Sequence, residues 1–400
     1  MTVELFFLIL GLVILAGFFG GIFFQRFRIP EVIILMGIGF LLGSVTHLVP
    51  VEGFYSVAPF FGTLALIMIL FEGGLDLDFT PVARGWKKAI SLSVLTFVLT
   101  VAGISVLVYY LTPWDAFQGL LLGAALGCVS GTIVIPLVAK MSLNEETKTI
   151  LSVESALADA LAVLTVVLGI DYFLNPAQGG IILGSVVSAF TNSIFFSLLT
   201  GLVWLRILPL LKGKPLTYML TFAVLLLLYS GVESVGGSGA LAVLLFGLFL
   251  SNGELLKSLY PKRFRAGLIH TDLLLDDTLK WFHAEFSFLI RTFFFVYMGL
   301  IVHFENLTLQ WVTLSGLIFL VIISARAITV GMLFKKDDNI GGRKLIWGML
   351  PRGLTSAVLA SYPLSKGMSG TGVFLDITFL VIVLTNVFLA LLLLGRPKPQ

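Results

Sequence analysis

Long apolar segments alternate with short polar connections along the whole chain. A helix that crosses a bilayer needs about 20 mostly apolar residues, and the chain offers thirteen such segments, of which the ninth is short. The predicted spans are residues 3–24, 31–49, 57–77, 88–111, 116–139, 148–173, 179–205, 215–233, 239–252, 285–303, 309–334, 342–362 and 373–395. Only Gly236-Gly237-Ser238-Gly239 separates the eighth from the ninth, so their merging is the main alternative. The pattern predicts an all-α polytopic membrane protein with about 13 transmembrane helices.

Composition narrows the function classes. Hydrophobic residues make up 58% of the chain and charged residues 12%, whereas soluble domains average about 25% charged residues. No polar stretch is long enough for a soluble catalytic domain, so we expect no enzyme and no cofactor. The single cysteine excludes an internal disulfide and a Cys-cluster metal site, and a net charge of +3 gives no reason to expect nucleic-acid binding. The lipid bilayer is the expected partner.

The basic residues divide unequally between the two sides of the membrane. With thirteen spans, 21 of the 25 Lys and Arg residues fall on one side, and only Lys366 falls on the other. The other three, Arg291, Arg326 and Arg352, lie inside spans. The positive-inside rule then predicts a multi-pass protein of the cell (inner) membrane, with its N-terminus outside and its C-terminus in the cytoplasm.

Two further segments concern the cytoplasmic side. In residues 253–283, leucines are interleaved with charged residues, which predicts amphipathic helices lying on the membrane surface, or alternatively a solvated linker. The chain stops five residues after the last span. We therefore expect either a membrane domain alone or one whose C-terminal cytoplasmic regulatory domain is absent from this chain.

Ionisable residues within spans are costly and indicate function. Asp159 lies near the middle of the sixth span, where its carboxylate can hold either a proton or a monovalent cation. Alternatively, it holds helices together through a hydrogen bond. Glu154 lies five residues earlier, about 140° around the helix, and should face a different neighbour. Arg326 in the eleventh span lies at a comparable depth, so we predict a Glu154–Arg326 ion pair, with snorkelling of Arg326 as the alternative.

Glycine and proline interrupt the fifth and twelfth spans, within Gly127–Pro136 and within Trp347–Ser356. Broken helices at corresponding places in two halves indicate a transporter site; the alternative is ordinary kinks. We predict two inverted six-helix repeats joined by the seventh helix, with the two interrupted helices crossing at the midplane. Arg352 would offset carbonyl ends there. Released carbonyls and the hydroxyls of Ser130, Thr132 and Ser155 would complete an oxygen shell around a small cation at Asp159.

Four motifs resemble one family. Glu154-Ser155-Ala156-Leu157-Ala158-Asp159 resembles the E-S-x-L-N-D motif of NhaP and NHE-type sodium/proton exchangers. Residues 347–353 resemble their G-G-L-R-G-A motif, and Ala325-Arg326-Ala327 resembles their A-R-x stretch. Residues 130–134 resemble the S-S-T-A-I stretch of the Kef and NapA branch. On these motifs, the chain is identified as a member of the monovalent cation/proton antiporter superfamily.

The resemblance implies a homodimer that works by elevator-type alternating access. Residues 1–87 and 179–303 would form the dimerisation scaffold, and residues 88–178 and 304–400 the mobile core. Asp159 would be the ion- and proton-binding carboxylate, Glu154–Arg326 the core ion pair and Arg352 the charge at the crossing. Two departures remove side-chain oxygens: Ala158 replaces the family asparagine, and Ile133 replaces an aspartate common in the NhaP branch.

These observations predict an antiporter that exchanges Na⁺ or K⁺ for protons. One carboxylate at the site favours one proton per cation and therefore electroneutral exchange. The alternatives are a cation channel, although no selectivity-filter sequence is evident, and a membrane sensor or subunit that has lost transport. Glu72, at the cytoplasmic end of the third span, is either a funnel carboxylate or a helix-end charge. We expect Arg291 to snorkel to the cytoplasm.

Overall fold

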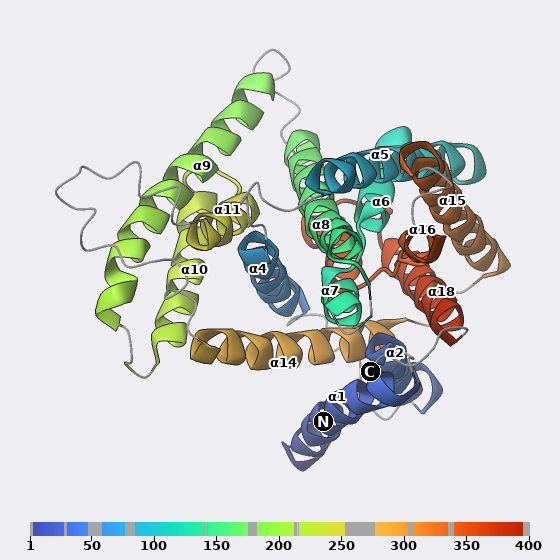
Figure 1. Cartoon of the computed structure of the whole chain (residues 1–400), viewed down its shortest axis with the longest axis horizontal. Coiled ribbons are helices and arrows are strands. Elements are labelled where there is room, and N and C mark those ends of the chain that lie inside the picture. The colour runs from blue at the N-terminus through green and yellow to red at the C-terminus, as the bar shows by residue number, and fades with distance from the viewer. Residues whose placement is uncertain are drawn as a thin grey trace. The chain divides into compact units, whose positions relative to one another are not determined.

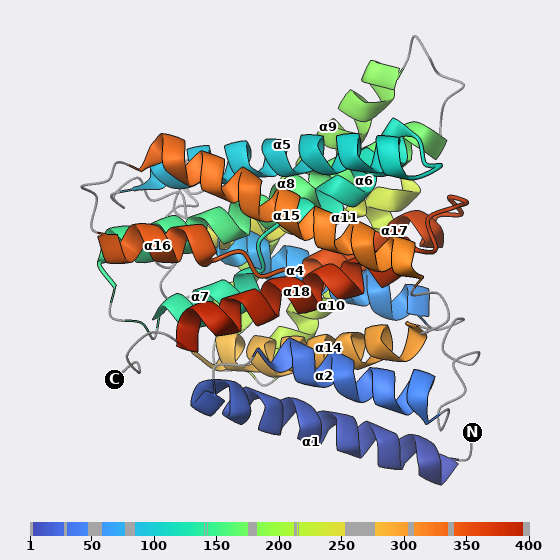
Figure 2. The same ribbon diagram turned by 90° about the vertical axis from the view of Figure 1, so that its right-hand side faces the viewer.

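The computed structural model describes residues 3–27, 30–46, 58–76, 85–139, 141, 143–174, 182–211, 214, 216–252, 277–302, 308–334 and 340–394. Every regular element within these residues is helical, and each predicted span coincides with one helix or with two consecutive ones (Figures 1 and 2). Most of the linker predicted at 253–283 lies outside the described residues; its last residues belong to a helix that starts at Asp277. The prediction of an all-helical membrane fold with about 13 spans is confirmed.

Two compact units make up the chain. The first comprises residues 1–63, 82–166 and 289–400, and the second comprises residues 64–81 and 167–288. Helices wholly within the first unit are α1 (Val3–Phe27), α2 (Glu31–Phe40), η1 (Leu41–Val45), α5 (Trp86–Leu111), α6 (Ala116–Gly127), α7 (Gly131–Ala139), α15 (Leu309–Leu333), α16 (Ile340–Gly348), α17 (Leu354–Ser365) and α18 (Phe374–Leu394). Helices wholly within the second are α9 (Ile182–Ile207), η3 (Leu208–Leu211), α10 (Thr217–Ser234) and α11 (Gly239–Ser251). The helices α4 (Ala58–Asp76), α8 (Glu145–Leu174) and α14 (Asp277–Ile301) run from one unit into the other.

The predicted scaffold and mobile core are not the same division as these units. The first unit contains residues 88–166 and 304–400 of the predicted core. In addition, it contains α1, α2 and the C-terminal half of α14. A scaffold and a core are defined by relative movement, whereas the units are defined by contacts within one conformation. The division into scaffold and core therefore stays a prediction.

Glycines set how closely α2 and α14 approach in the first unit. A Cβ added to Gly39 would lie 2.0 Å from the carbonyl oxygen of Val296, and one added to Gly299 would lie 2.2 Å from that of Met36. The backbones therefore touch directly, as in other small-residue helix pairs within membranes. An ion pair joins the same helices, with Arg291 Nη2 2.9 Å from Glu31 Oε1. The sequence did not indicate this ion pair, and the expectation that Arg291 snorkels stays a prediction, because Glu31 lies at the start of α2 and both side chains are partly exposed.

Helices α9, α10 and α11 pack together in the second unit, and glycines again bring α4 and α11 into backbone contact. A Cβ on Gly74 would lie 2.2 Å from the carbonyl oxygen of Leu244. The predicted separation of the eighth and ninth spans is confirmed. Helix α10 ends at Ser234, and α11 starts at Gly239 after a turn in which Ser238 caps the new helix by accepting a hydrogen bond from Leu241 N.

Candidate functional site

Two interrupted helices meet in the first unit. The first break, Cys128-Val129-Ser130, separates α6 from α7, and the second, Met349–Gly353, separates α16 from α17 (Figure 2). Ser130 N donates a hydrogen bond of 2.9 Å to the carbonyl oxygen of Pro351, which joins the two breaks through their backbones. Gly353 allows this approach, because a Cβ there would lie 2.3 Å from Ser130 Oγ. The predicted crossing of the two interrupted helices is therefore present.

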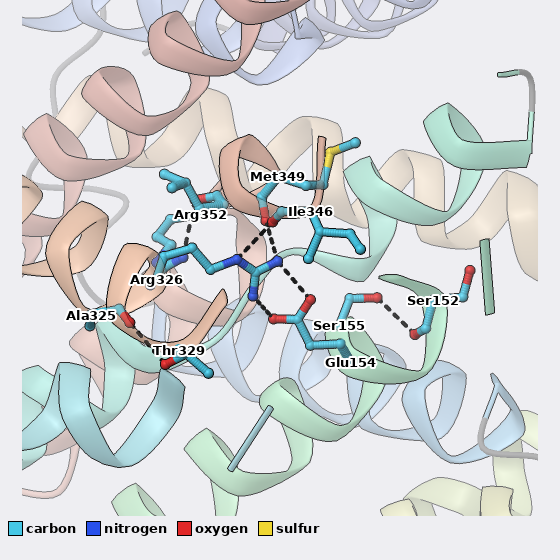
Figure 3. Close-up of polar contacts among 10 residues, drawn as sticks. Ser152, Glu154, Ser155, Ala325, Arg326, Thr329, Ile346, Met349 and Arg352 are labelled. Carbon is cyan, nitrogen blue, oxygen red and sulfur yellow. Dashed lines mark hydrogen bonds and ion pairs between the residues drawn. The ribbon is translucent and has the colours of Figure 1, made fainter. Parts of the chain in front are cut away.

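The Glu154–Arg326 pair lies beside the second break, and both side chains are at most 1% exposed. Arg326 Nη2 donates to Glu154 Oε2 over 2.8 Å, and Arg326 Nη1 pairs with Glu154 Oε1, so the contact is bidentate (Figure 3). The same guanidinium donates through Nε to the carbonyl oxygen of Ile346 (2.9 Å) and through Nη2 to that of Met349 (3.1 Å). Arg326 therefore also caps the carboxyl end of α16, where carbonyls lack helical partners and partial negative charge collects.

Arg352 caps the other half-helix in the same manner. Its side chain is fully buried, and its Nε donates a 2.8 Å hydrogen bond to the carbonyl oxygen of Leu126 in the last turn of α6. Its Nη1 donates to the carbonyl oxygen of Leu350 within its own break (3.0 Å). Each half-helix that ends at the crossing is thus capped by one buried arginine, which offsets the negative end of its dipole. This geometry agrees with the predicted contact of Arg352 with carbonyl ends.

Every carbonyl of the second break is hydrogen-bonded. The donors for Met349–Gly353, in chain order, are Arg326 Nη2, Arg352 Nη1, Ser130 N, Asn386 Nδ2 and Ala357 N. Non-helical backbone at membrane depth survives only where protein or a cavity satisfies it, and here protein satisfies these carbonyls. Each of these carbonyls accepts one hydrogen bond, and a carbonyl oxygen has two lone pairs, so their part in an ion shell stays a prediction.

Asp159 faces the start of α7. A Cβ added to Gly131, the first residue of α7, would lie 3.8 Å from Asp159 Oδ2 and 3.6 Å from Ser155 Oγ. Asp159 is half-buried and Ser155 is buried, and the positive end of the α7 dipole favours negative charge at this place. Ser130 Oγ and Thr132 Oγ1 lie 3.1 Å apart at the same helix start. The structure thus brings the predicted residues of the site together in one unit.

Two of the predicted residues also have partners outside the proposed ion shell. Ser155 Oγ donates to the carbonyl oxygen of Ser152 (2.9 Å), so its hydroxyl is an acceptor for any further partner (Figure 3). Glu72 lies on α4 in the second unit, where it interacts with Tyr218. As predicted, Glu154 and Asp159 contact different neighbours: Glu154 pairs with Arg326 of α15, and Asp159 faces α7.

The sequence did not single out three residues that contact the site. The buried Cys128 thiol interacts with Asp159 and lies 3.1 Å from Ser356 Oγ in α17. Thr385 and Asn386 of α18 bond to the backbone of Arg352. Thr385 and Asn386 are two of the buried polar residues of the last span, which also contains Asp376 and Thr378, but nothing in the sequence specified their partners.

Comparison with known proteins gives one family and one fold. A family model described as "Sodium/hydrogen exchanger, transmembrane" matches residues 10–394. The structure of the sodium proton antiporter MjNhaP1 from Methanocaldococcus jannaschii at pH 8 matches with a TM-score of 0.79 at 21% identity, covering 98% of this chain and 100% of that one. This likeness shows the fold.

Two curated relatives match over most of the chain. K(+)/H(+) antiporter NhaP2 of Shewanella sp. (strain ANA-3) is 28% identical over 367 residues, which cover 90% of this chain and 61% of that protein. Na(+)/H(+) antiporter 1 of M. jannaschii is 24% identical over 440 residues, covering 98% of this chain and 96% of that one. The chain therefore spans about three fifths of the length of the NhaP2 relatives.

Proposed function

Because the chain belongs to the sodium/hydrogen exchanger family, we propose that this multi-pass membrane protein is a secondary antiporter that exchanges Na⁺ or K⁺ for protons. The observation that carries the proposal is the place of Asp159, a half-buried carboxylate against the first residue of a broken helix. The relatives add support, since one is named a K(+)/H(+) antiporter and another a Na(+)/H(+) antiporter.

Competition for Asp159 is the proposed mechanism. A bare carboxylate in a partly buried setting is unfavourable, and either a proton or a monovalent cation relieves that cost. One site cannot hold both, so binding of one releases the other. Alternating exposure of the neutralised site to the two sides then couples the two fluxes in opposite directions.

The oxygen shell is assigned to the α7 and α8 side of the crossing. Ser130, Thr132 and Ser155 place hydroxyl oxygens around the first turn of α7, on the same side as Asp159. The carbonyls of the second break are already hydrogen-bonded, and three of their five donors are arginine or asparagine side chains. The hydroxyls beside α7 are therefore the proposed main ligands, and the second break holds the opposite side of the crossing in place.

The two arginines offset negative charge at the crossing, and their hydrogen bonds go to groups other than the Asp159 carboxylate. Arg326 is bound to Glu154 and to the end of α16, and Arg352 is bound to the end of α6. A fixed positive charge at the crossing leaves the single carboxylate to neutralise one cation or one proton. This favours one-for-one, electroneutral exchange.

The larger-scale assignments are also proposals. The basic residues favour an N-terminus outside and a C-terminus in the cytoplasm of the cell (inner) membrane. The family resemblance favours a homodimer in which a scaffold of residues 1–87 and 179–303 supports a moving core of residues 88–178 and 304–400. Ala158 and Ile133 leave the site poorer in oxygen than its relatives' motif, so both Na⁺ and K⁺ stay candidates.

Proton flux in proteoliposomes tests the proposal. Purified protein is reconstituted with a trapped pH dye, and Na⁺, K⁺ and Li⁺ are titrated at several pH values. We expect cation-driven proton efflux that Asp159→Asn abolishes. The matched control is Glu146→Gln on the same helix, a half-exposed carboxylate that pairs with Lys88, which should transport normally. Equal flux in the Asp159→Asn variant would refute the proposal, and single-channel currents would indicate a channel instead.

A further inference from the structure

Two consecutive residues of α18 hold the backbone of Arg352. The peptide nitrogen of Arg352 donates a 3.1 Å hydrogen bond to Thr385 Oγ1, and its carbonyl oxygen accepts one of 2.8 Å from Asn386 Nδ2. All three residues are fully buried. Both polar backbone groups of one residue are thus bound by side chains 33 and 34 positions away.

Arg352 needs these bonds because it lies in non-helical backbone. A buried N–H or C=O without a partner costs about as much as a lost hydrogen bond, and the break provides no helical partner for either group. The Thr385 hydroxyl also donates within its own helix, to the carbonyl oxygen of Val381 over 2.8 Å. Its proton is therefore directed into α18, and its lone pair is directed at Arg352.

The held backbone fixes where the guanidinium reaches. From this anchor, Arg352 Nε bonds to the carbonyl oxygen of Leu126, two residues before Cys128. The Cys128 thiol in turn interacts with Asp159. A connected series of contacts therefore runs from α18 through Arg352 and the end of α6 to the carboxylate.

We propose that Thr385 and Asn386 are positioning residues for ion exchange, which keep the Arg352 guanidinium on the end of α6 and away from Asp159. The inference rests on the proposed function. If the backbone of Arg352 is released, its guanidinium gains freedom to reach the nearby carboxylate. A tethered cation at Asp159 competes with the transported one, so the cation concentration for half-maximal exchange rises while the maximal rate changes little.

Three variants and one matched control test this role. Thr385→Val and Asn386→Leu each remove one bond to Arg352, whereas Thr385→Ser retains the hydroxyl. The control is Thr378→Val, on the same helix and equally buried, whose hydroxyl bonds to none of the described residues. Loss of one net hydrogen bond corresponds to about a fivefold change. We expect half-maximal exchange at about fivefold higher cation concentration in the first two variants and wild-type values in the other two.

A second readout needs no transport. Cys128 is the only cysteine in the chain and is fully buried, so its rate of alkylation by a small thiol reagent in the purified full chain reports loosening at the end of α6. We expect about fivefold faster labelling in Thr385→Val and Asn386→Leu, and wild-type rates in Thr385→Ser and Thr378→Val. If Thr385→Val is not recovered as a folded protein, Thr385→Ala replaces it in both assays.

The outcomes separate this inference from the function on which it rests. Wild-type half-saturation in both Thr385→Val and Asn386→Leu overturns the positioning role, even if labelling accelerates, because the two residues would then only stabilise the fold. A rise in half-saturation that Thr378→Val shares overturns it as well. A different outcome is faster labelling of Cys128 in Thr385→Val and Asn386→Leu when the wild-type protein itself exchanges no cation. That outcome would refute the proposed function, but the two residues would still hold Arg352.

Discussion

At the scale of single residues, the crossing depends on two buried arginines that each have two tasks. Arg326 neutralises Glu154 and caps α16, and Arg352 caps α6 and the carbonyl of Leu350. A buried charge is expensive when its partner is removed, because the remaining charge keeps its desolvation cost. The two members of the Glu154–Arg326 pair are nevertheless not equivalent, since only the arginine also binds backbone carbonyls.

Glu154→Ala should destabilise the protein by about 3–5 kcal/mol, since Arg326 keeps its buried charge without a counter-ion. Thermal unfolding in detergent measures this loss. The exposed Glu145–Lys148 pair at the start of α8 provides the control, and Glu145→Ala should change stability by less than about 1 kcal/mol.

The double substitution Glu154→Leu with Arg326→Met should recover part of that loss, since no unpaired charge is left. Recovery should be incomplete, because the carbonyls of Ile346 and Met349 lose their donor in every variant that lacks Arg326. A double-mutant cycle quantifies the coupling. Strictly additive effects of the two substitutions would show that the pair is not formed.

At the scale of helices, small residues decide where backbones meet. Gly353 lets the second break lie against Ser130, and Gly39, Gly43 and Gly299 let α2 and η1 lie against α14. At Gly39, Gly43 and Gly299 the nearest atoms belong to the backbone of the facing helix, which cannot move aside as a side chain can, so an added methyl group there displaces a whole helix.

Gly353→Ala should impair exchange and stability, because its Cβ would lie 2.8 Å from Ser130 Cβ and closer still to Ser130 Oγ. Overpacking of this kind costs about 1–3 kcal/mol. Gly316→Ala in α15 is the control, since a Cβ there meets nothing within 4 Å. Ser130→Gly in the Gly353→Ala background should recover stability, as measured by thermal unfolding, and failure to recover would mean that the two breaks do not touch here.

Gly39→Ala should separate α2 from α14, since its Cβ would lie 2.0 Å from the carbonyl oxygen of Val296. Gly37, two residues earlier on the same helix, has nothing within 4 Å of an added Cβ. The melting temperature of Gly37→Ala should therefore equal that of the wild type, while Gly39→Ala melts several degrees lower. Equal melting temperatures for the two variants would contradict the described packing.

Sequence reasoning reached the helices and the breaks but not the partners across them. Glycine and proline within 127–136 and 347–356 interrupt apolar runs, and both breaks lie inside these segments. Opposite charges at one depth similarly located the Glu154–Arg326 pair. The contacts of Arg352 with Leu126, Thr385 and Asn386 have no comparable signal in the sequence. Every residue has the same backbone carbonyl group, and threonine and asparagine side chains within a span can bond to many different neighbours. The ion pair of Arg291 with Glu31 was missed for the same reason, since Glu31 lies 260 residues earlier.

At the scale of the whole molecule, one unit contains the entire site. Asp159, the two arginines and the two breaks belong to the first unit, whereas Glu72 belongs to the second. The same residues, except Glu72, also lie in the predicted core of residues 88–178 and 304–400, which the proposed elevator-type mechanism requires to move as a body. The charge moved is then that of Asp159 with its bound ion, which is zero with either a proton or a monovalent cation.

Electroneutral exchange predicts independence of membrane potential. Proteoliposomes with an imposed potential of either sign should show the same initial rate of cation-driven proton flux, and a potential-sensitive dye should report no potential generated by exchange itself. Moving one net charge would involve about 2.3 kcal/mol per 100 mV, which is large enough to detect. A rate that follows the imposed potential would show that more than one proton accompanies each cation.

Proton release on cation binding tests the competition at Asp159 most directly. The purified protein is held in weakly buffered detergent at a pH where the site is protonated, and Na⁺ or K⁺ is added while a pH dye records the change. Binding that displaces a proton releases it to solution, so we predict about one proton per bound cation for the wild type and none for Asp159→Asn. Equal proton release from wild type and Asp159→Asn would contradict the account, because the proton and the cation would then meet at some other group.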